Sequence, residues 1–464
     1  MSDPVAELAR ILPDGWLVGG TVRDRVLGRE TADFDVATAG SAADVARGLG
    51  KAAGGVAFEL SETFGAWRVV AHERTWQVDV LPLNGATIEE DLGRRDLTIN
   101  AIAAPLSSVG YVDPYGGLED LNARRLRAVS PVAFERDPLR TLRLARLACE
   151  LGFTVEPATQ GLARAAAPGL AKVAPERVFA ELRRVVCAPA ALAGLDLMDT
   201  LGVTDAVLPE LAELRGVEQS RFHHLDVADH TRSVLAEVIG LERDPARLAG
   251  EETPALVAFL SEPLANDMTR AQALRFGALL HDIAKPQTRA VTPQGRVTFM
   301  GHDEAGARLG MEILGRLRAS ERLREHVAAL TRHHLRLGFL VHEMPLSRRA
   351  VYDYLRATAP VSVDVTVLSV ADRLATRGDN AERAIATHLE LARQMLAEGL
   401  AWIADPPRPP VRGDELAQAL GIKPGPVLGD LLAELEAASF SGEVATPEEA
   451  IAHARELMAS EHIG

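Results

Sequence analysis

One stretch near the N-terminus constrains this chain more than any other. From residue 19 it reads G-G-T-V-R-D, and from residue 33 it reads D-F-D-V-A-T. The apolar residues before it predict a strand that runs into a glycine turn at Gly19 and Gly20, with Arg23 on a short helix. A second strand carries Asp33 and Asp35, whose side chains share one face because strand side chains alternate. The stretch therefore predicts the start of a small α/β domain.

The charged groups of this stretch suit metal-dependent phosphate chemistry. Two carboxylates close together on a strand cost free energy unless a cation lies between them. Oxygen ligands of this kind suit Mg²⁺, which often shares its shell with substrate phosphates. The N–H groups of the glycine turn and the guanidinium of Arg23 could bind phosphate oxygens. Singly, a Gly-Gly pair is more often a plain turn and a D-x-D more often a solvated strand end. The combination at this spacing favours nucleotidyl transfer.

Composition bounds the class of protein. At 464 residues the chain is long enough for about three domains. Aromatic residues make up only 4%, while alanine, leucine and arginine are abundant, which favours a largely helical protein. The two cysteines, Cys149 and Cys187, fit buried thiols in a reducing cytoplasm. No apolar run approaches the roughly eighteen residues of a membrane helix, and the N-terminus is not signal-like, so we expect a cytoplasmic protein without a membrane partner.

The charge distribution bears on a nucleic-acid partner. The net charge of −15 argues against one, because phosphate binding uses Lys and Arg. Residues 121–190, however, contain twelve Lys or Arg and six Asp or Glu. A basic middle in an acidic chain is compatible with RNA that is held locally.

Short strands and helices alternate in the first 125 residues. We expect strands at 16–18, 34–38, 67–71 and 75–81 and a helix at 42–49, which together make a small mixed sheet. Asp79, on the last of these strands, could be a third carboxylate facing Asp33 and Asp35, or an ordinary surface residue. The run R-R-D-L-T-I-N-A begins at residue 94. Its Arg95, Asp96 and Asn100 would suit triphosphate and ribose contacts, or form a basic loop before a capped helix.

A helix is predicted over 135–147, with Asp137 near its N-cap and Pro138 in its first turn. Asp137, Arg140, Arg143 and Arg146 are spaced by three, so Asp137 and Arg140 can act as a pair while Arg146 faces elsewhere. An acceptor Asp beside a donor Arg would match the amino group and ring nitrogen of adenine and cytosine and reject guanine and uracil. The alternative is an i,i+3 salt bridge on a solvated helix.

A second set of metal-type residues follows on predicted helices. His230, the dipeptide His281-Asp282 and Asp372 combine imidazoles with carboxylates, which suit a divalent transition metal or Mg²⁺. His302 and His333 could complete a binuclear site. This order, H…HD…D, resembles the HD phosphohydrolase superfamily, which implies a metal-dependent hydrolase of phosphomonoesters or cyclic phosphates.

The motifs of the first half resemble the class II members of the polymerase β nucleotidyltransferase superfamily. That group includes bacterial CCA-adding tRNA nucleotidyltransferases and bacterial poly(A) polymerases. The match covers the G-G…D-x-D stretch, the R-R-D-x-T-x-N-A run, the E-R-x-x-x-E spacing from Glu176 to Glu181, whose alternative is an Arg177–Glu181 helix pair, and the helical tail after residue 413. One departure is that Arg136 stands where the family's E-D-x-x-R motif has Glu.

The resemblance implies an α/β head at 1–125, a helical nucleotide-selecting and RNA-binding neck at 126–215, an HD domain at 216–400 and a helical tail at 401–464. It implies template-independent addition of CMP and AMP from CTP and ATP to tRNA 3′ ends, with divalent ions, Mg²⁺ in the head, held by Asp33 and Asp35. The implied nucleotide-binding residues are Gly19, Gly20, Arg23, Arg95, Asp96, Asn100, Asp137, Arg140, Arg143 and Arg146. Three alternatives stay open: a poly(A) polymerase, a relative that adds only CC or only A, and an HD nucleotide hydrolase whose head only binds nucleotides.

Overall fold

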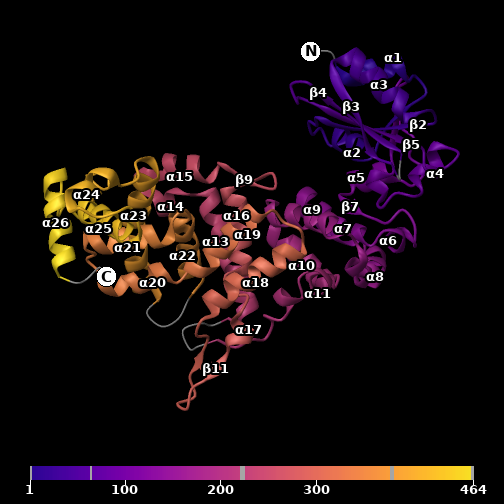
Figure 1. Cartoon of the computed structure of the whole chain (residues 1–464). Helices are drawn as coiled ribbons and strands as arrows, with labels where there is room; N and C mark the ends of the chain where they lie inside the picture. Colours follow the sequence, from indigo (N-terminus) through magenta and orange to yellow (C-terminus); the bar gives the residue numbers. More distant parts are fainter. Residues whose placement is uncertain (1–2, 63–64, 220–224, 377–380, 461–464) are drawn as a thin grey trace. The chain divides into compact units, whose positions relative to one another are not determined.

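The computed structural model describes residues 3–62, 65–219, 225–376 and 381–460 of the chain (Figure 1). The chain divides into two compact units, Met1–Val207 and Leu208–Gly464. None of the helices in the described ranges is long and apolar enough to cross a membrane. The finer division at residues 125, 215 and 400 stays a prediction.

A six-stranded mixed sheet forms the head of the first unit. Its strand order is β3-β4-β5-β2-β1-β6, and β2 pairs with β5 in parallel while the other neighbours are antiparallel. The expected strands are confirmed to within two residues at each end, and two further strands, β3 and β6, complete the sheet. The strands are β1 (Trp16–Val18), β2 (Asp33–Thr38), β3 (Gly55–Ser61), β4 (Ala66–Ala71), β5 (Gln77–Pro82) and β6 (Ala103–Pro105).

Two helices cover one face of this sheet (Figure 1). Helix α3 (Ala42–Ala53) packs on β3, β4 and β5, and α1 (Pro4–Ile11) packs on α3. The hydroxyl of Ser41 caps α3 by accepting from the N–H of Asp44, and Gly54 ends the helix in the left-handed conformation that glycine adopts without strain. Because Val45 and Leu49 are buried on the inner side of α3, its apolar face holds the sheet in place.

The neck differs from its prediction at one point. The helix expected over 135–147 is broken into α6 (Ala133–Arg136) and α7 (Leu139–Leu151). Asp137 between them is extended, with φ −147° and ψ 99°, because a residue before proline is disfavoured in the helical region. Its carboxylate accepts from the N–H of Leu139, so Asp137 does lie at the N-terminal end of α7. Helix α7 packs on α9 (Pro175–Cys187) and α10 (Ala191–Thr200).

The second unit consists mainly of helices, and six of them pack on one another as its central group. Helix α13 packs on α16 and α22, and α19 packs on α16 and α18. A small hairpin of β11 (Ala290–Val291) and β12 (Val297–Thr298) follows α17 (Lys285–Thr288). The helices of the group are α13 (Val227–Arg243), α16 (Arg270–Leu280), α18 (His302–Arg316), α19 (Glu321–His333), α22 (Ser362–Ala375) and α23 (Ala381–Ala404).

Three short helices form the tail, α24 (Gly413–Leu420), α25 (Pro426–Ser441) and α26 (Pro447–Ala459). They share a small apolar core that includes Leu416, Leu431 and Leu435. Helix α25 packs on α21 (Arg348–Thr358), so the tail packs against the other helices of the second unit (Figure 1).

Candidate functional site

The glycine turn of the head brings three functional groups together. Gly19 follows β1 and is the N-cap residue of α2 (Gly20–Val26), with φ +65°. A Cβ atom at this position would lie 2.7 Å from Nη1 of Arg95 and 3.5 Å from Oδ2 of Asp35. Glycine is therefore required for its backbone conformation, and a Cβ there would in addition displace the guanidinium of Arg95.

The carboxylates of the head lie on two neighbouring strands. Asp33 and Asp35 are on β2, and Asp79 of β5 is the register partner of Asp35. Arg68 of β4 holds Asp79 with two hydrogen bonds, of 2.6 and 2.8 Å, so Asp79 already has a cationic partner. Burial, reinforced by the charges of Asp79 and Asp33 and opposed by Arg95, raises the pKa of Asp35 to about 6. A buried carboxylate in this environment fits a divalent cation, which would offset the cost of its charge.

A chain of hydrogen bonds runs from the head to the neck. Nη1 of Arg23 donates to Oδ1 of Asn100 (2.8 Å), and Nδ2 of Asn100 donates to Oδ1 of Asp96 (2.9 Å). Nη1 of Arg143 donates to the other oxygen of Asp96 at 3.3 Å. Burial by itself would raise the pKa of Asp96, but Arg143 and Asn100 hold it at about 2. The structure thus links four of the predicted nucleotide-binding residues.

Sequence reasoning missed Asp91, the residue that orients Arg95. Both Nε and Nη2 of Arg95 donate to Oδ2 of the buried Asp91, at 3.1 and 2.9 Å. Oδ1 of Asp91 accepts from the N–H of Asn84 (3.0 Å), which fixes the carboxylate in turn. The i,i+4 spacing of Asp91 and Arg95 on α4 (Ile88–Leu92) and the turn that follows is the signal that could have found this pair.

The i,i+3 salt bridge between Asp137 and Arg140, the alternative to a base-recognising pair, does not form in the described structure. Arg140 donates to the backbone carbonyls of Arg94 (2.8 Å), Arg95 (3.1 Å) and Ala133 (3.0 Å). The carboxylate of Asp137 accepts from Nη2 of Arg177 at 2.8 Å. The two side chains therefore take different partners, because the break before Pro138 removes Asp137 from the α7 helix on which the spacing argument placed it.

Helix α9 supplies the partner of two arginines of α7. Arg146 does not join Asp137 or Arg140: together with Arg143 it binds the carboxylate of Glu181 on α9, at 2.5 and 3.0 Å respectively. The alternative Arg177–Glu181 pair is also wrong, since Arg177 binds Asp137. Residues three apart on a helix point about 60° apart. The side chains of Arg143 and Arg146 are long enough to reach the same Glu181 carboxylate across this angle.

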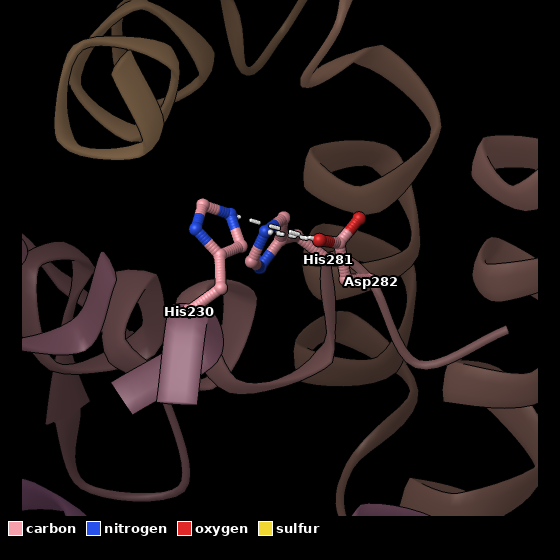
Figure 2. Close-up of side chains that lie close together, drawn as sticks. All are labelled: His230, His281 and Asp282. Carbon is pink, nitrogen blue, oxygen red and sulfur yellow. Dashed lines mark ion pairs between the residues drawn. The ribbon is translucent and has the colours of Figure 1, made fainter. Parts of the chain in front are cut away.

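A cluster of histidines and carboxylates lies at the centre of the second unit. His230 comes from α13, His281 and Asp282 from the end of α16, and Asp372 from α22. Nε2 of His230 lies 3.0 Å from Oδ1 of Asp372 and 3.7 Å from Oδ2 of Asp282, and Nε2 of His281 lies 3.1 Å from the same Oδ2. Figure 2 shows both imidazole rings beside the Asp282 carboxylate. His230, His281 and Asp282 are close enough to share one metal ion.

A second group uses the other oxygen of Asp282. Nε2 of His302 lies 3.3 Å, and Nε2 of His334 3.8 Å, from Oδ1 of Asp282, and these three residues could also share one metal ion. His333 was expected here, but its Nδ1 accepts from Nε of Arg336 instead. Adjacent residues on a helix point about 100° apart, so the end of α19 directs only one histidine of the pair to Asp282.

The protonation of this cluster suits metal binding. Nδ1 of His281, His302 and His334 each lies within 2.6–2.8 Å of a backbone carbonyl, of Ala278, Phe299 and Thr331 respectively. A carbonyl only accepts, so each Nδ1 donates its proton there and leaves Nε2 as the atom available to a metal ion. Although burial opposes it, the charge of Asp282 and the hydrogen bond to it raise the pKa of His281. Burial and the charge of His281 lower the pKa of His334 to about 4, which keeps this imidazole neutral. Two ions sharing the Asp282 carboxylate fit this donor set.

Three known sequence families match successive parts of the chain. The Poly A polymerase head domain matches residues 15–127. The family described as the probable RNA and SrmB-binding site of polymerase A matches residues 152–214, and the HD domain matches residues 253–377. The fold and the sites together define a nucleotidyltransferase head and neck joined to an HD domain, two domain types that depend on divalent metal ions.

Comparison with known relatives shows to which family of nucleotidyltransferases the chain belongs. The chain is 36% identical to the A-adding tRNA nucleotidyltransferase of Deinococcus radiodurans, over 94% of both proteins. It is also 36% identical to the CC-adding tRNA nucleotidyltransferase of Thermus thermophilus, over 94% of this chain and 92% of the relative. The chain belongs to the family of bacterial tRNA nucleotidyltransferases. Its fold is that of the Thermotoga maritima CCA-adding enzyme complexed with tRNA, with a TM-score of 0.62 at 18% identity over 98% of this chain and 94% of that one.

Proposed function

We propose that this enzyme adds CMP and AMP to the 3′ ends of tRNA, from CTP and ATP and without a nucleic-acid template. The observation that carries the proposal is the convergence of the Gly19 turn, Arg95 and Asp35 at one end of the sheet. Relatives that align along nearly the whole chain act on the same class of RNA, as their names state. Because tRNA and nucleoside triphosphates are its proposed substrates and both cysteines are free thiols, we place its activity in the cytoplasm.

The head residues divide the work of the transfer. Asp33 and Asp35 would hold Mg²⁺, which supplies charge neutralisation to the reacting 3′-hydroxyl and to the leaving pyrophosphate. The N–H groups of the turn and the guanidinium groups of Arg23 and Arg95 would bind the triphosphate, and Asp96 with Asn100 would contact the ribose. The 3′-oxygen then forms a bond to the α-phosphorus as the bond to pyrophosphate breaks, and the hydroxyl proton is released.

Base selection is assigned to the neck. Asp137 presents carboxylate oxygens that can accept from the amino group of cytosine or adenine, and Arg140 presents a donor for the ring nitrogen. The contacts of Arg140 with the carbonyls of Arg94 and Arg95 connect this pair to the triphosphate-binding loop. Arg177 orients Asp137 from the facing helix. Bases with the reverse order of donor and acceptor would leave both groups unpaired.

A second candidate is addition of CC alone or of A alone. It is favoured by the names of the two relatives at 36% identity, one A-adding and one CC-adding, which both align over 94% of this chain. Addition of a long poly(A) tail is not favoured by these relatives. The choice between the first two candidates is a question of which primers the enzyme extends.

Primer extension on tRNA transcripts tests both candidates. Transcripts that end before CCA, after C and after CC are incubated with CTP, ATP, both, or GTP with UTP, and the products are resolved at single-nucleotide length. We expect three additions that then stop on the shortest transcript. Addition of two C residues only, or of A only on the CC-ended transcript, would establish the second candidate. A long A ladder, or no product in any lane, would overturn the proposal.

We also propose that the second unit binds divalent metal ions and hydrolyses phosphomonoesters or cyclic phosphates. The supporting observation is the shared carboxylate of Asp282 between two groups of buried histidines. Water would form a bond to phosphorus as the ester bond breaks, and the alcohol would take a proton. Phosphate release from adenosine 3′-monophosphate, compared between the native chain and His281→Ala with metal content measured in both, tests this activity. Equal metal content and equal release would contradict it.

A further inference from the structure

A cavity of about 560 Å³ opens beside the histidine cluster of the second unit. His334 and Asp372, which belong to that cluster, form part of its wall. The rest of the wall comes from α20 (Arg336–Leu340) with the turn after it, from α22 and from α23. The volume falls within the range of small-molecule sites, about 300–1,000 Å³, and exceeds what a lone phosphate ion needs.

The charge of the cavity favours an anion. Arg373 and Arg383 both line it, and Asp372 is the only acidic residue among the lining residues in the described ranges. Nε of Arg373 is buried and makes no hydrogen bond within the described structure, although a buried guanidinium N–H normally has a partner. The side chain of Arg373 also lines the cavity next to Asp372, so its guanidinium is placed to bind an oxygen atom of a phosphate there.

The remaining wall offers both apolar surface and neutral polar groups. Leu335, Val341 and Ala384 supply the apolar part. Ser369 and His388 supply the polar part and lie 3.2 Å apart, between Oγ and Nε2. A planar base with a sugar presents this same mixture of apolar faces and hydrogen-bonding edges, whereas a free inorganic anion presents none of it.

We propose that this cavity is the subsite for a nucleotide-sized phosphate ester, the class to which a phosphorylated 3′-terminal ribonucleotide of RNA belongs. Arg373 binds the phosphate beside the metal site, Arg383 makes the second cationic contact, and the apolar wall takes the nucleoside. The assignment rests on the phosphohydrolase activity proposed above for the same unit. It adds the residues that recognise the substrate, as distinct from those that hold the metal ions.

Calorimetric titration of the full chain with adenosine 3′-monophosphate tests the subsite, in EDTA and again with Mn²⁺. We expect Arg373→Ala to weaken binding by about tenfold or more and Arg373→Lys to weaken it less, because lysine keeps the charge but loses the fork. Arg412→Ala, an exposed arginine in the tail, is the matched control and leaves the affinity unchanged. Arg383→Ala, at an exposed position, provides a second test should Arg373→Ala fail to fold.

The head also binds nucleotides, so Arg95→Ala is titrated in parallel. Equal affinities for Arg373→Ala and Arg412→Ala, or a loss of binding in Arg95→Ala alone, would overturn the subsite. Inorganic phosphate that binds as tightly as the nucleotide would overturn the role of the apolar wall. If binding depends on Arg373 but the native chain releases no phosphate, the hydrolase activity is contradicted and the subsite is supported. If the native chain releases phosphate and Arg373→Ala has an unchanged KM, the hydrolase activity is supported and the subsite is contradicted.

Discussion

At the scale of single residues, the buried carboxylate of Asp35 is the group of the head site whose ionisation costs folding free energy. Its pKa is raised to about 6, chiefly by burial and further by Asp79 and Asp33, so the folded chain holds a proton there more readily than the unfolded chain. The contribution to stability is complete below the unfolded pKa of about 4 and is lost as the pH rises through about 6. Above that pH, in the absence of a cation, the ionised carboxylate therefore destabilises the head.

Asp35→Asn should raise the melting temperature of the metal-free protein at pH 7–8 by about 2–4 °C, and the gain should disappear near pH 5. The same variant should lose nucleotide addition while tRNA binding is retained. Thermal melts in EDTA across this pH range, together with primer extension and a filter-binding assay, provide the measurements. Glu59→Gln, at an exposed position on β3, is the control that leaves the pH profile of melting unchanged. Nucleotide addition by Asp35→Asn at the native rate would refute the site.

Asp137 carries the second prediction at this scale. Asp137→Ala should reduce the preference for CTP and ATP over UTP and GTP by about tenfold, the order of one lost bidentate base contact. Arg177→Ala, which removes only the partner that orients the carboxylate, should give a smaller reduction. Competitive single-nucleotide addition to one primer measures the ratio directly. Unchanged selectivity in both variants would show that other residues recognise the base.

At the scale of elements, the end of α19 decides which histidine serves the second unit. His334→Ala should lower the bound divalent metal per chain, because its Nε2 faces Asp282. His333→Ala should leave the metal content unchanged, since this neighbour binds Arg336. Elemental analysis of both variants beside the native chain provides the comparison. The opposite pattern would mean that α19 ends in a different rotation from the one described.

The contact between α7 and α9 depends on Glu181. Its buried carboxylate joins Arg143 and Arg146, which keep Asp96 and Glu150 as their other partners, so Glu181→Ala should destabilise the first unit by about 1–3 kcal/mol. Glu59→Ala, an exposed glutamate on β3, should change stability by less than about 0.5 kcal/mol. Three of the four tryptophans lie in the first unit, so urea unfolding followed by fluorescence reports on it. Equal midpoints for the two variants would show that Glu181 is dispensable.

At the scale of the whole molecule, the two sites belong to separate compact units. The carboxylates of the head all lie before residue 100, and the histidine cluster lies after residue 225. No residue is shared between the two described sites, so their chemistry should be separable by mutation.

His281→Ala should therefore lose metal from the second unit and still add nucleotides to tRNA within about twofold of the native rate. Asp35→Asn should show the converse, with phosphate release unchanged and nucleotide addition abolished. Each variant is assayed for both reactions under one buffer condition. A loss of nucleotide addition in His281→Ala, with the fold intact by circular dichroism, would reveal coupling between the two units.

The sequence by itself determined the residues whose roles depend on spacing along one strand or one short turn. Asp33 and Asp35 share a face because β-strands alternate, and the Gly19 turn follows from the apolar run that ends at it. The H…HD…D order indicated the second site in the same way, because each of its members lies on a helix or directly follows one. Local geometry is enough for such predictions, since it does not depend on which elements pack together.

Only the tertiary structure decided the partners that come from elsewhere in the chain. Arg140 binds carbonyls 45 and 46 residues away, and Glu181 lies 35 residues beyond Arg146, so no local pattern contains these contacts. The choice of His334 over His333 depends on the rotation at which α19 ends against α16 and α18. Spacing along the chain fixes which residues can share a face, whereas packing fixes what that face meets.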